Sequence, residues 1–99
     1  MRILVTGISG QVGHELMRTL APLGDVVGVD RAAMDLSSPD SIRAVVRSTA
    51  PDLIFNPAAY TAVDKAESEP DEAMRINGVA PGVLGEEAAR LGAWLVHYS

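Results

Sequence analysis

Residues 7–13 read GISGQVG, with a glycine at every third position, and they follow the apolar run ILV at residues 3–5. A continuous apolar run is typical of a strand that is covered on both faces of a parallel sheet. After the glycines, Val12, Leu16 and Leu20 recur at the spacing of one helical face. The stretch therefore predicts a strand, a tight glycine turn and a helix in direct succession.

The chain continues this alternation of strands and helices. Further strands are predicted at residues 26–29, 52–56 and 93–98. A helix is expected between Ser38, which can cap it, and Pro51, which ends it. With right-handed crossovers, these elements predict one α/β domain. Its fold class is a Rossmann-type doubly wound parallel sheet, with four strands in the order 3-2-1-4 and helices on both faces.

A second helical region precedes the last strand. It is expected to begin near Pro70 and to break or kink at Asn77-Gly78 and Pro81. A further helix then follows, and Gly92 is its natural C-terminal stop.

The composition of the chain argues against several classes of partner and of chemistry. The 99 residues carry a net charge of −5, and Lys65 is the only lysine. The missing basic stripe argues against a nucleic-acid partner. The chain has no cysteine, which excludes disulfides and thiolate chemistry. We find neither a signal peptide nor an apolar run of membrane-spanning length, so we expect a soluble cytoplasmic protein with no membrane partner.

Each glycine of the turn has a physical role. Gly7 allows a tight turn out of the strand, Gly10 lets backbone approach a pyrophosphate, and Gly13 lets the helix sit close to the sheet. The N–H groups near Gly10, Gln11 and Val12 are expected to point at the anion, with the helix dipole adding to the attraction. The alternative is a tight strand–helix turn that binds no ligand. The favoured hypothesis is a nicotinamide-dinucleotide site.

Acidic residues after the second predicted strand support this hypothesis. Asp30 stands where a carboxylate can accept hydrogen bonds from ribose hydroxyls, or it is an ordinary solvated aspartate. Asp30 favours NADH, whereas Arg31 could pair with the 2′-phosphate of NADPH, so the preference stays open. Asp35 and Leu36 either contact the adenine or form a simple turn before Ser38.

Three segments carry a more specific resemblance. They are GxxGQVGxEL at residues 7–16, NPAAYTAVDKAE at residues 56–67 and GAWLVHYS at residues 92–99. Together they resemble the dTDP-4-dehydrorhamnose reductase family, which belongs to the extended short-chain dehydrogenase/reductase superfamily. The resemblance covers the whole chain, and its middle segment is the most specific.

The resemblance implies an activity and a set of cofactor contacts. The family reduces dTDP-4-dehydro-β-L-rhamnose to dTDP-L-rhamnose with NADPH or NADH, so the expected partners are the dinucleotide and a dTDP-sugar. The residues that match its cofactor site are Gly10, Gln11, Val12, Asp30, Asp35, Leu36, Ala59, Tyr60, Thr61 and Tyr98.

The loop after the third predicted strand fits this assignment. Ala58 and Ala59 are small, as a backbone that passes close to a cofactor needs, and they follow the carboxyl end of a parallel strand. The alternative for both is ordinary tight packing.

The superfamily catalyses with a Ser or Thr just after the fourth strand and with a later Tyr-x-x-x-Lys pair. In the family the segment continues past Ser99 with Thr-Asp, and the resemblance implies that this threonine is the catalytic one. Tyr60 and Tyr98 are the only tyrosines, and Tyr60 is followed four residues later by Asp64. We therefore expect the catalytic residues beyond Ser99, and we interpret residues 1–99 as a cofactor-binding domain truncated before the substrate region. The alternative is a non-catalytic regulatory module of the same fold, which binds NAD(P).

Other polar residues are expected to be structural. His14 and His97 lack carboxylates at metal-ligand spacing, and Glu86-Glu87 is expected to be a solvated helix face. The sequence shows no clear metal site. Mg²⁺ is left open by one group of acidic residues, which are expected to be surface charges on a short helix: Asp64, Glu67 and Glu69.

The last predicted strand is expected to form an unprotected sheet edge. Its apolar residues Trp94, Leu95 and Val96 would then favour self-association, which leaves a homodimer open.

Overall fold

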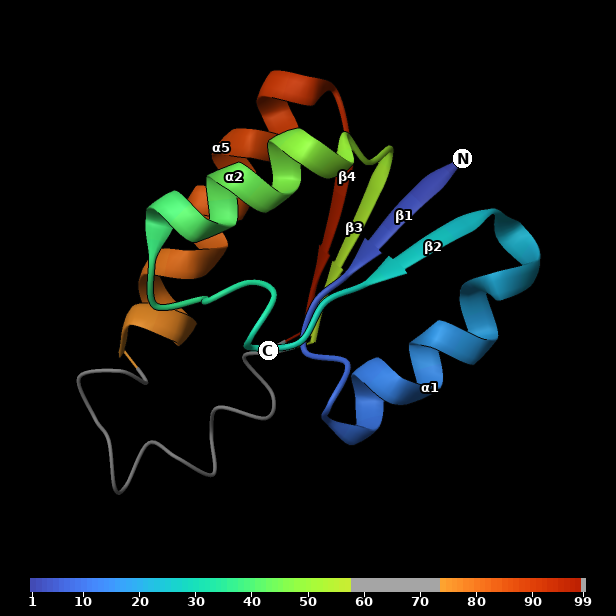
Figure 1. Ribbon diagram of the computed structural model, residues 1–99. Helices are drawn as coiled ribbons and strands as arrows, with labels where there is room; N and C mark the ends of the chain where they lie inside the picture. Colours follow the sequence, from blue (N-terminus) through green and yellow to red (C-terminus); the bar gives the residue numbers. More distant parts are fainter. Residues whose placement is uncertain (58–73, 99) are drawn as a thin grey trace.

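The computed structural model describes residues 1–57 and 74–98, and in them a four-stranded parallel sheet lies between two layers of helices (Figure 1). In chain order the elements are β1 (Arg2–Val5), α1 (Gln11–Leu20), the short helix η1 (Ala21–Leu23), β2 (Asp25–Gly28), α2 (Pro39–Thr49), β3 (Leu53–Asn56), the π-helical turn η3 (Arg75–Val79), α5 (Ala80–Leu91) and β4 (Trp94–His97). The predicted α/β class, with helices on both faces of a doubly wound parallel sheet, is confirmed.

The strands lie in the order β2-β1-β3-β4, and every neighbouring pair is parallel. Counted along this chain, the sheet shares only the β1/β2 pair with the 3-2-1-4 order, because β3 pairs with β1 rather than with β2, and β4 pairs with β3 rather than with β1. The cause is a reversal of direction: the chain steps from β1 to β2 on the α1 face, and α2 then carries it back past β1 on the opposite face. Right-handed crossovers in opposite directions place their helices on opposite faces.

This reversal creates a switch point between β1 and β3. The chain after β1 leads to α1 on one face, and the next described helix after β3, α5, lies on the other face (Figure 1). Ligands of open α/β sheets bind in the crevice outside the carboxyl ends of two such strands. The fold therefore places a candidate site at the ends of β1 and β3.

Strand β1 is covered on both faces, as its continuous apolar run predicts. Ile3 and Val5 pack with Leu20 on the α1 side, while Leu4 packs with Ile54 on the side of α2 and α5. The three β1 side chains are 0% exposed. Burying an aliphatic side chain of this size contributes about 1.5–3 kcal/mol, so β1 anchors both halves of the core.

Helix α2 begins and ends where the sequence predicts. The Ser38 hydroxyl accepts a hydrogen bond from the N–H of Ser41 at 3.3 Å, and Pro39 occupies the first turn. At the other end, Ala50 adopts a left-handed conformation with φ of 48°, and its N–H donates to the carbonyl of Val46 at 2.8 Å. Both ends satisfy backbone groups that a helix terminus leaves without partners.

The expected break near Asn77-Gly78 is a wider helical turn and not an interruption. The π-helical turn η3 leads directly into α5, with Pro81 in the first turn of that helix. Pro81 has no N–H to donate to a preceding carbonyl, and π-helix occurs mostly as single turns of this kind beside or within an α-helix. Gly92 ends α5 in a left-handed conformation with φ of 71°, as predicted.

Strand β4 forms one edge of the described sheet. Trp94 is 78% exposed and Val96 is 39% exposed, while Leu95 points inward and packs against the core. The described part of the chain therefore presents apolar side chains beside an unpaired strand edge, as the sequence predicts.

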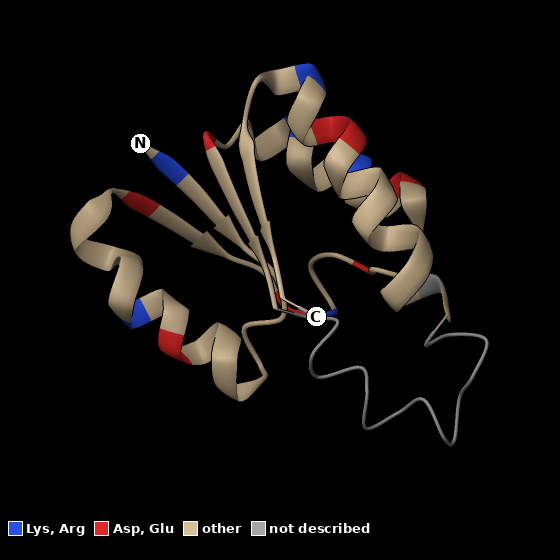
Figure 2. Cartoon of the chain, turned by 180° about the vertical axis from the view of Figure 1, so that it is seen from behind, with Lys and Arg blue, Asp and Glu red and all other residues tan. Residues whose placement is uncertain are grey.

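Charged residues of both signs are interspersed along α2 and α5 (Figure 2). Glu86 is exposed and pairs with Arg43 at 3.3 Å. Glu87, however, is not on a solvated face, because it is only 3% exposed and lies under Arg47. The expectation for Glu87 is wrong, since α2 packs against α5 at this residue.

Among the described helices, none has the length and apolar character that crossing a membrane requires.

Candidate cofactor site

The turn from β1 into α1 has the backbone geometry that its glycines predict. Gly7 adopts a positive φ of 60°, a conformation that is unfavourable for residues with a Cβ atom. The N–H of Gly10 donates to the carbonyl of Gly7 at 3.1 Å and closes the turn. Gly10 is also the N-cap residue of α1, with no side chain to occupy the helix end.

Gly13 allows α1 to approach this turn. A Cβ at Gly13 would overlap the carbonyl oxygen of Gly7 and would come 2.9 Å from the Cα of Ile8. The close approach is therefore between the helix and the turn itself, which refines the expected contact between helix and sheet. Any larger residue at Gly13 would push the turn away from the helix N-terminus.

The N-terminus of α1 is suited to an anion. The first i→i−4 hydrogen bond of the helix runs from the N–H of His14 to the carbonyl of Gly10 at 3.0 Å, so the amides of the residues between them have no partner inside the helix. The first turn carries no acidic side chain that would occupy those amides or repel a phosphate. Amides and helix dipole together fit a pyrophosphate at Gly10, Gln11 and Val12.

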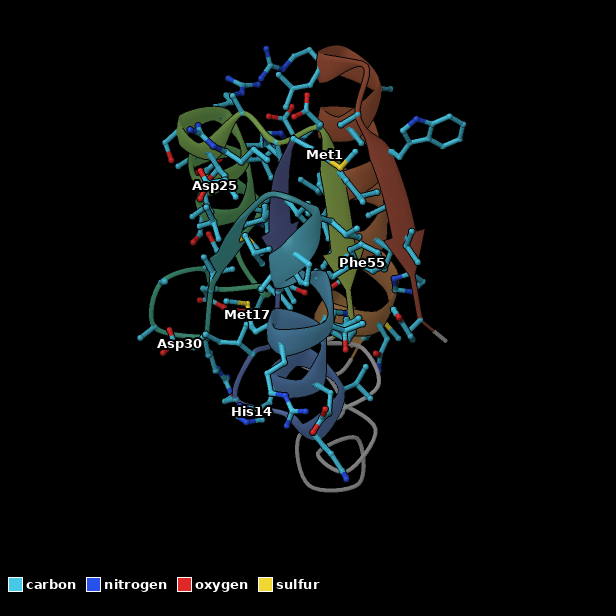
Figure 3. All side chains as sticks on the ribbon, turned by 90° about the vertical axis from the view of Figure 1, so that its right-hand side faces the viewer. Met1, His14, Met17, Asp25, Asp30 and Phe55 are labelled. Atoms are coloured by element: carbon cyan, nitrogen blue, oxygen red, sulfur yellow. The ribbon has the colours of Figure 1, made fainter. Side chains whose placement is uncertain are left out.

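Asp30 lies just beyond β2, at the end of the sheet opposite Met1 and Asp25 (Figure 3). Its side chain is exposed, and its Oδ1 accepts a hydrogen bond from the N–H of Ala33 at 2.9 Å. This turn holds the carboxylate beside the carboxyl end of β2. The structure thus brings Asp30 and the glycine turn to the same end of the sheet.

Met17 of α1 packs against β2, the strand that precedes Asp30 (Figure 3). A Cβ at Gly28, the last residue of β2, would come 2.6 Å from the sulfur of Met17 and 2.9 Å from a methyl group of Ile8. The missing side chain at Gly28 therefore lets α1 lie close to β2, next to the turn.

Asp35 has the contacts of a turn residue. Its Oδ1 accepts hydrogen bonds from the N–H and the hydroxyl of Ser37, at 2.9 and 2.6 Å, and its own N–H donates to the hydroxyl of Ser41 at 3.0 Å. The hydroxyl of Ser37 is the main reason that the pKa of Asp35 lies below its ordinary value, and the charge of exposed Arg31 adds to the effect. Leu36 packs against the core cluster. These contacts match the turn that was one of the two expectations, and an adenine contact stays a prediction.

Thr6 and Asn56, to which the sequence analysis gave no role, lie with His97 at the carboxyl ends of β1, β3 and β4. The hydroxyl of Thr6 donates to Oδ1 of Asn56 at 2.6 Å, and Nδ2 of Asn56 lies 3.1 Å from Nδ1 of His97. Tyr98 follows directly, and its N–H donates to the carbonyl of Asn56 at 3.4 Å. The sequence contains a signal for these residues, because each is a polar residue that ends or follows an apolar strand, where ligands of parallel sheets bind.

Part of the predicted site lies outside the described residues, namely Ala58, Ala59, Tyr60 and Thr61, and so do Ser99 and the acidic residues Asp64, Glu67 and Glu69. Within residues 1–57 and 74–98, no three His, Asp or Glu side chains are grouped closely enough to hold a metal ion.

Comparisons with known proteins identify the family to which the chain is similar. The family model described as "RmlD substrate binding domain" matches residues 1–99. The dTDP-4-dehydrorhamnose reductase of Escherichia coli (strain K12) is 48% identical over 103 residues, which cover 100% of this chain and 34% of that protein. Its counterpart in Burkholderia thailandensis is 50% identical over 99 residues, or 100% of this chain and 33% of that protein.

A solved structure gives the same result. The crystal structure of dTDP-4-dehydrorhamnose reductase from Bacillus anthracis in complex with NADP is similar with a TM-score of 0.83 and 34% identity, over 95% of this chain and 34% of that chain. The chain spans about a third of the length of the curated relatives it matches. The resemblance drawn from the three sequence segments is confirmed.

Proposed function

Because the chain belongs to the RmlD substrate binding domain family, we propose that residues 1–99 form the cofactor-binding part of a dTDP-4-dehydrorhamnose reductase. The whole enzyme would reduce the 4-keto group of dTDP-4-dehydro-β-L-rhamnose with NADPH or NADH. The bound dinucleotide supplies the hydride, and the residues described here hold and orient it.

The observation that carries this proposal is the fit between Gly13 and the turn. The Cβ that Gly13 lacks would occupy the carbonyl position of Gly7, so the turn and the first amides of α1 converge only because that side chain is missing. A pyrophosphate placed there would accept hydrogen bonds from backbone without any positive side chain.

The order of the strands indicates how the proposed dinucleotide would lie across the sheet, from β2 toward β4. Asp30, at the end of β2, would accept hydrogen bonds from a ribose of the adenosine half. The pyrophosphate would lie at α1, after β1, and the nicotinamide half would extend over β3 toward β4. The loop with Ala58, Ala59, Tyr60 and Thr61 follows β3 in the sequence, in agreement with its proposed place along the cofactor.

We also propose that these 99 residues bind the cofactor without turning it over. They contain no Tyr-x-x-x-Lys pair to donate a proton to the carbonyl oxygen as hydride arrives. The purified chain should therefore leave NADH and NADPH unoxidised when the sugar nucleotide is added. Measured oxidation that depends on the sugar would contradict this part of the proposal.

The direct test is a calorimetric titration of the chain and two variants with NADH and NADPH. Gln11→Glu adds a negative charge at the exposed start of α1, where it stabilises the helix but repels a pyrophosphate. We expect this variant to be as stable as the unaltered chain or more so, and to bind either dinucleotide about tenfold more weakly, which corresponds to about 1.4 kcal/mol.

Gly13→Ala tests the geometry of the turn, with Gly82→Ala as its matched control. A Cβ at Gly13 displaces the turn, whereas a Cβ at Gly82 meets no atom within 4 Å. We expect Gly13→Ala to lower affinity, and Gly82→Ala to retain it and to stabilise α5 by up to about 1 kcal/mol. Equal affinities for all variants, or no binding by the unaltered chain, would contradict the proposed site.

A further inference from the structure

Hydrogen bonds between three side chains connect β1, β3 and β4 at the carboxyl ends of these strands. They run from the Thr6 hydroxyl to Oδ1 of Asn56 at 2.6 Å and from Nδ2 of Asn56 to Nδ1 of His97 at 3.1 Å. Thr6 is 0% exposed and Asn56 is 1% exposed, while His97 is exposed on the edge strand. Asn56 and His97 are also direct partners in the register of β3 and β4.

The orientation of the Asn56 amide assigns the roles of these groups. With its Nδ2 toward His97, the amide donates and Nδ1 of His97 accepts, an arrangement that places the ring hydrogen on Nε2. The hydroxyl of Thr6 holds the amide in this orientation, because it donates to the amide oxygen. One buried amide thus links the end of β1 to the ring of His97.

These hydrogen bonds lie beside the glycine turn and the end of β4. Thr6 immediately precedes the glycine turn, and Tyr98 immediately follows His97. The N–H of Tyr98 donates to the carbonyl of Asn56, so backbone and side chain of Asn56 both hold the end of β4. In the proposed placement, the adenosine half of the cofactor lies at the opposite edge of the sheet, over β2.

We propose that Asn56 and His97 are positioning residues that fix the end of β4 beneath the nicotinamide half of the dinucleotide. The inference rests on the proposed function, and it makes a sharper claim: the hydrogen bond between these two side chains contributes to binding of the nicotinamide half and not of the adenosine half. A purely structural role would affect both halves alike.

Two ligands and two variants of His97 separate these possibilities. NADH spans the whole crevice, whereas ADP carries only the adenosine and pyrophosphate part. His97→Ala removes the acceptor, and His97→Asn replaces it with an amide oxygen near the position of Nδ1. Because His97 is exposed, both variants are expected to fold, which circular dichroism would check.

Calorimetry should show that His97→Ala weakens NADH binding by about three- to tenfold, the value of one hydrogen bond, and leaves ADP binding unchanged. His97→Asn should restore most of the lost NADH affinity. In the unaltered chain, nitrogen NMR of the ring should show the hydrogen on Nε2.

The outcomes against the proposal differ from those against the proposed function. Failure of the unaltered chain to bind NADH or ADP would overturn the proposed function and this inference with it. If NADH binds but His97→Ala weakens both ligands equally or neither, the positioning role alone is overturned. A His97→Asn variant as weak as His97→Ala would likewise overturn it.

Discussion

The carboxylate of Glu87 on α5 accepts a hydrogen bond from Nε of Arg47 on α2 at 2.8 Å, although the side chain of Glu87 is only 4% exposed. Nε of Arg90 lies 3.5 Å from the other carboxylate oxygen. The two arginines keep their stems and charges at the surface while the acid is covered. This contact joins the two helices on one face of the sheet, and its loss would leave a covered carboxylate without its partners.

The pH dependence of stability follows from this contact. The hydrogen bond from Arg47 is the main cause that holds the pKa of Glu87 below its ordinary value of 4.5, and burial opposes it. Because the pKa is lower in the folded chain, the stabilisation is complete above the ordinary value and is lost as pH falls through the lowered one. We expect the free energy of unfolding, measured with urea, to fall as the pH is lowered from about 5 through the lowered pKa of Glu87, and to fall less in Glu87→Gln.

Glu86→Gln is the matched control, because it removes the neighbouring charge from a side chain that is 71% exposed. Asp35, whose pKa is also lowered, is unchanged in both variants and contributes equally to them. A pH profile of Glu87→Gln that coincides with those of the unaltered chain and of Glu86→Gln would contradict the role of Glu87.

Features that depend on local backbone could be predicted from the sequence. Gly7 and Gly92 have the positive φ values, 60° and 71°, that their positions after a strand and a helix indicate. Ser38 caps α2 with its own side chain. In each case the residue type and its immediate neighbours determine the conformation, so one short window of sequence is sufficient.

Features that depend on packing between distant segments could not be predicted. Whether Glu87 faces solvent is decided by α2, which precedes it by 40 residues at Arg47. The hydrogen bonds of Asn56 require the register in which it pairs with His97. The neighbours of β1 were equally beyond local reasoning, because the direction of the crossover through α2 decides which strand lies beside it.

The preference between NADH and NADPH should depend on Asp30. In Asp30→Asn the side-chain oxygen can still accept the N–H of Ala33, but the negative charge that repels a 2′-phosphate is gone. At this exposed position, the repulsion between the carboxylate and the 2′-phosphate amounts to about 1 kcal/mol. We therefore expect the affinity for NADPH to rise about fivefold relative to the affinity for NADH. Competition titrations with both dinucleotides would measure the ratio.

Asp25→Asn provides the control for Asp30→Asn. It makes the same change of charge at the opposite end of β2, where Asp25 pairs with Arg2 at 3.4 Å (Figure 3). The ratio of NADPH to NADH affinity should not change in Asp25→Asn. An equal change of the ratio in both variants would show that only net charge matters and would remove Asp30 from the proposed site.

The exposed edge at β4 should cause self-association of the chain. Trp94 is 78% exposed beside strand groups that have no described neighbour, and such edges pair with other strands. Light scattering should give a mass above that of one chain, rising with concentration, and Trp94→Lys should lower it. Met74→Lys, at a residue that is 72% exposed on a helix, is the control and should not. A concentration-independent monomer would contradict this prediction.

In the proposed site, the glycine turn and the first amides of α1 hold the pyrophosphate of a nicotinamide dinucleotide. Amide NMR of the labelled chain during titration with NADH is the most direct test of this contact. We expect the largest shifts at residues 7–13 and further shifts at Asp30 and Tyr98, and we expect Gln11→Glu to weaken all of them together. Saturating NADH that leaves the amides of residues 7–13 unmoved, or that moves only residues elsewhere, would contradict the proposed contact.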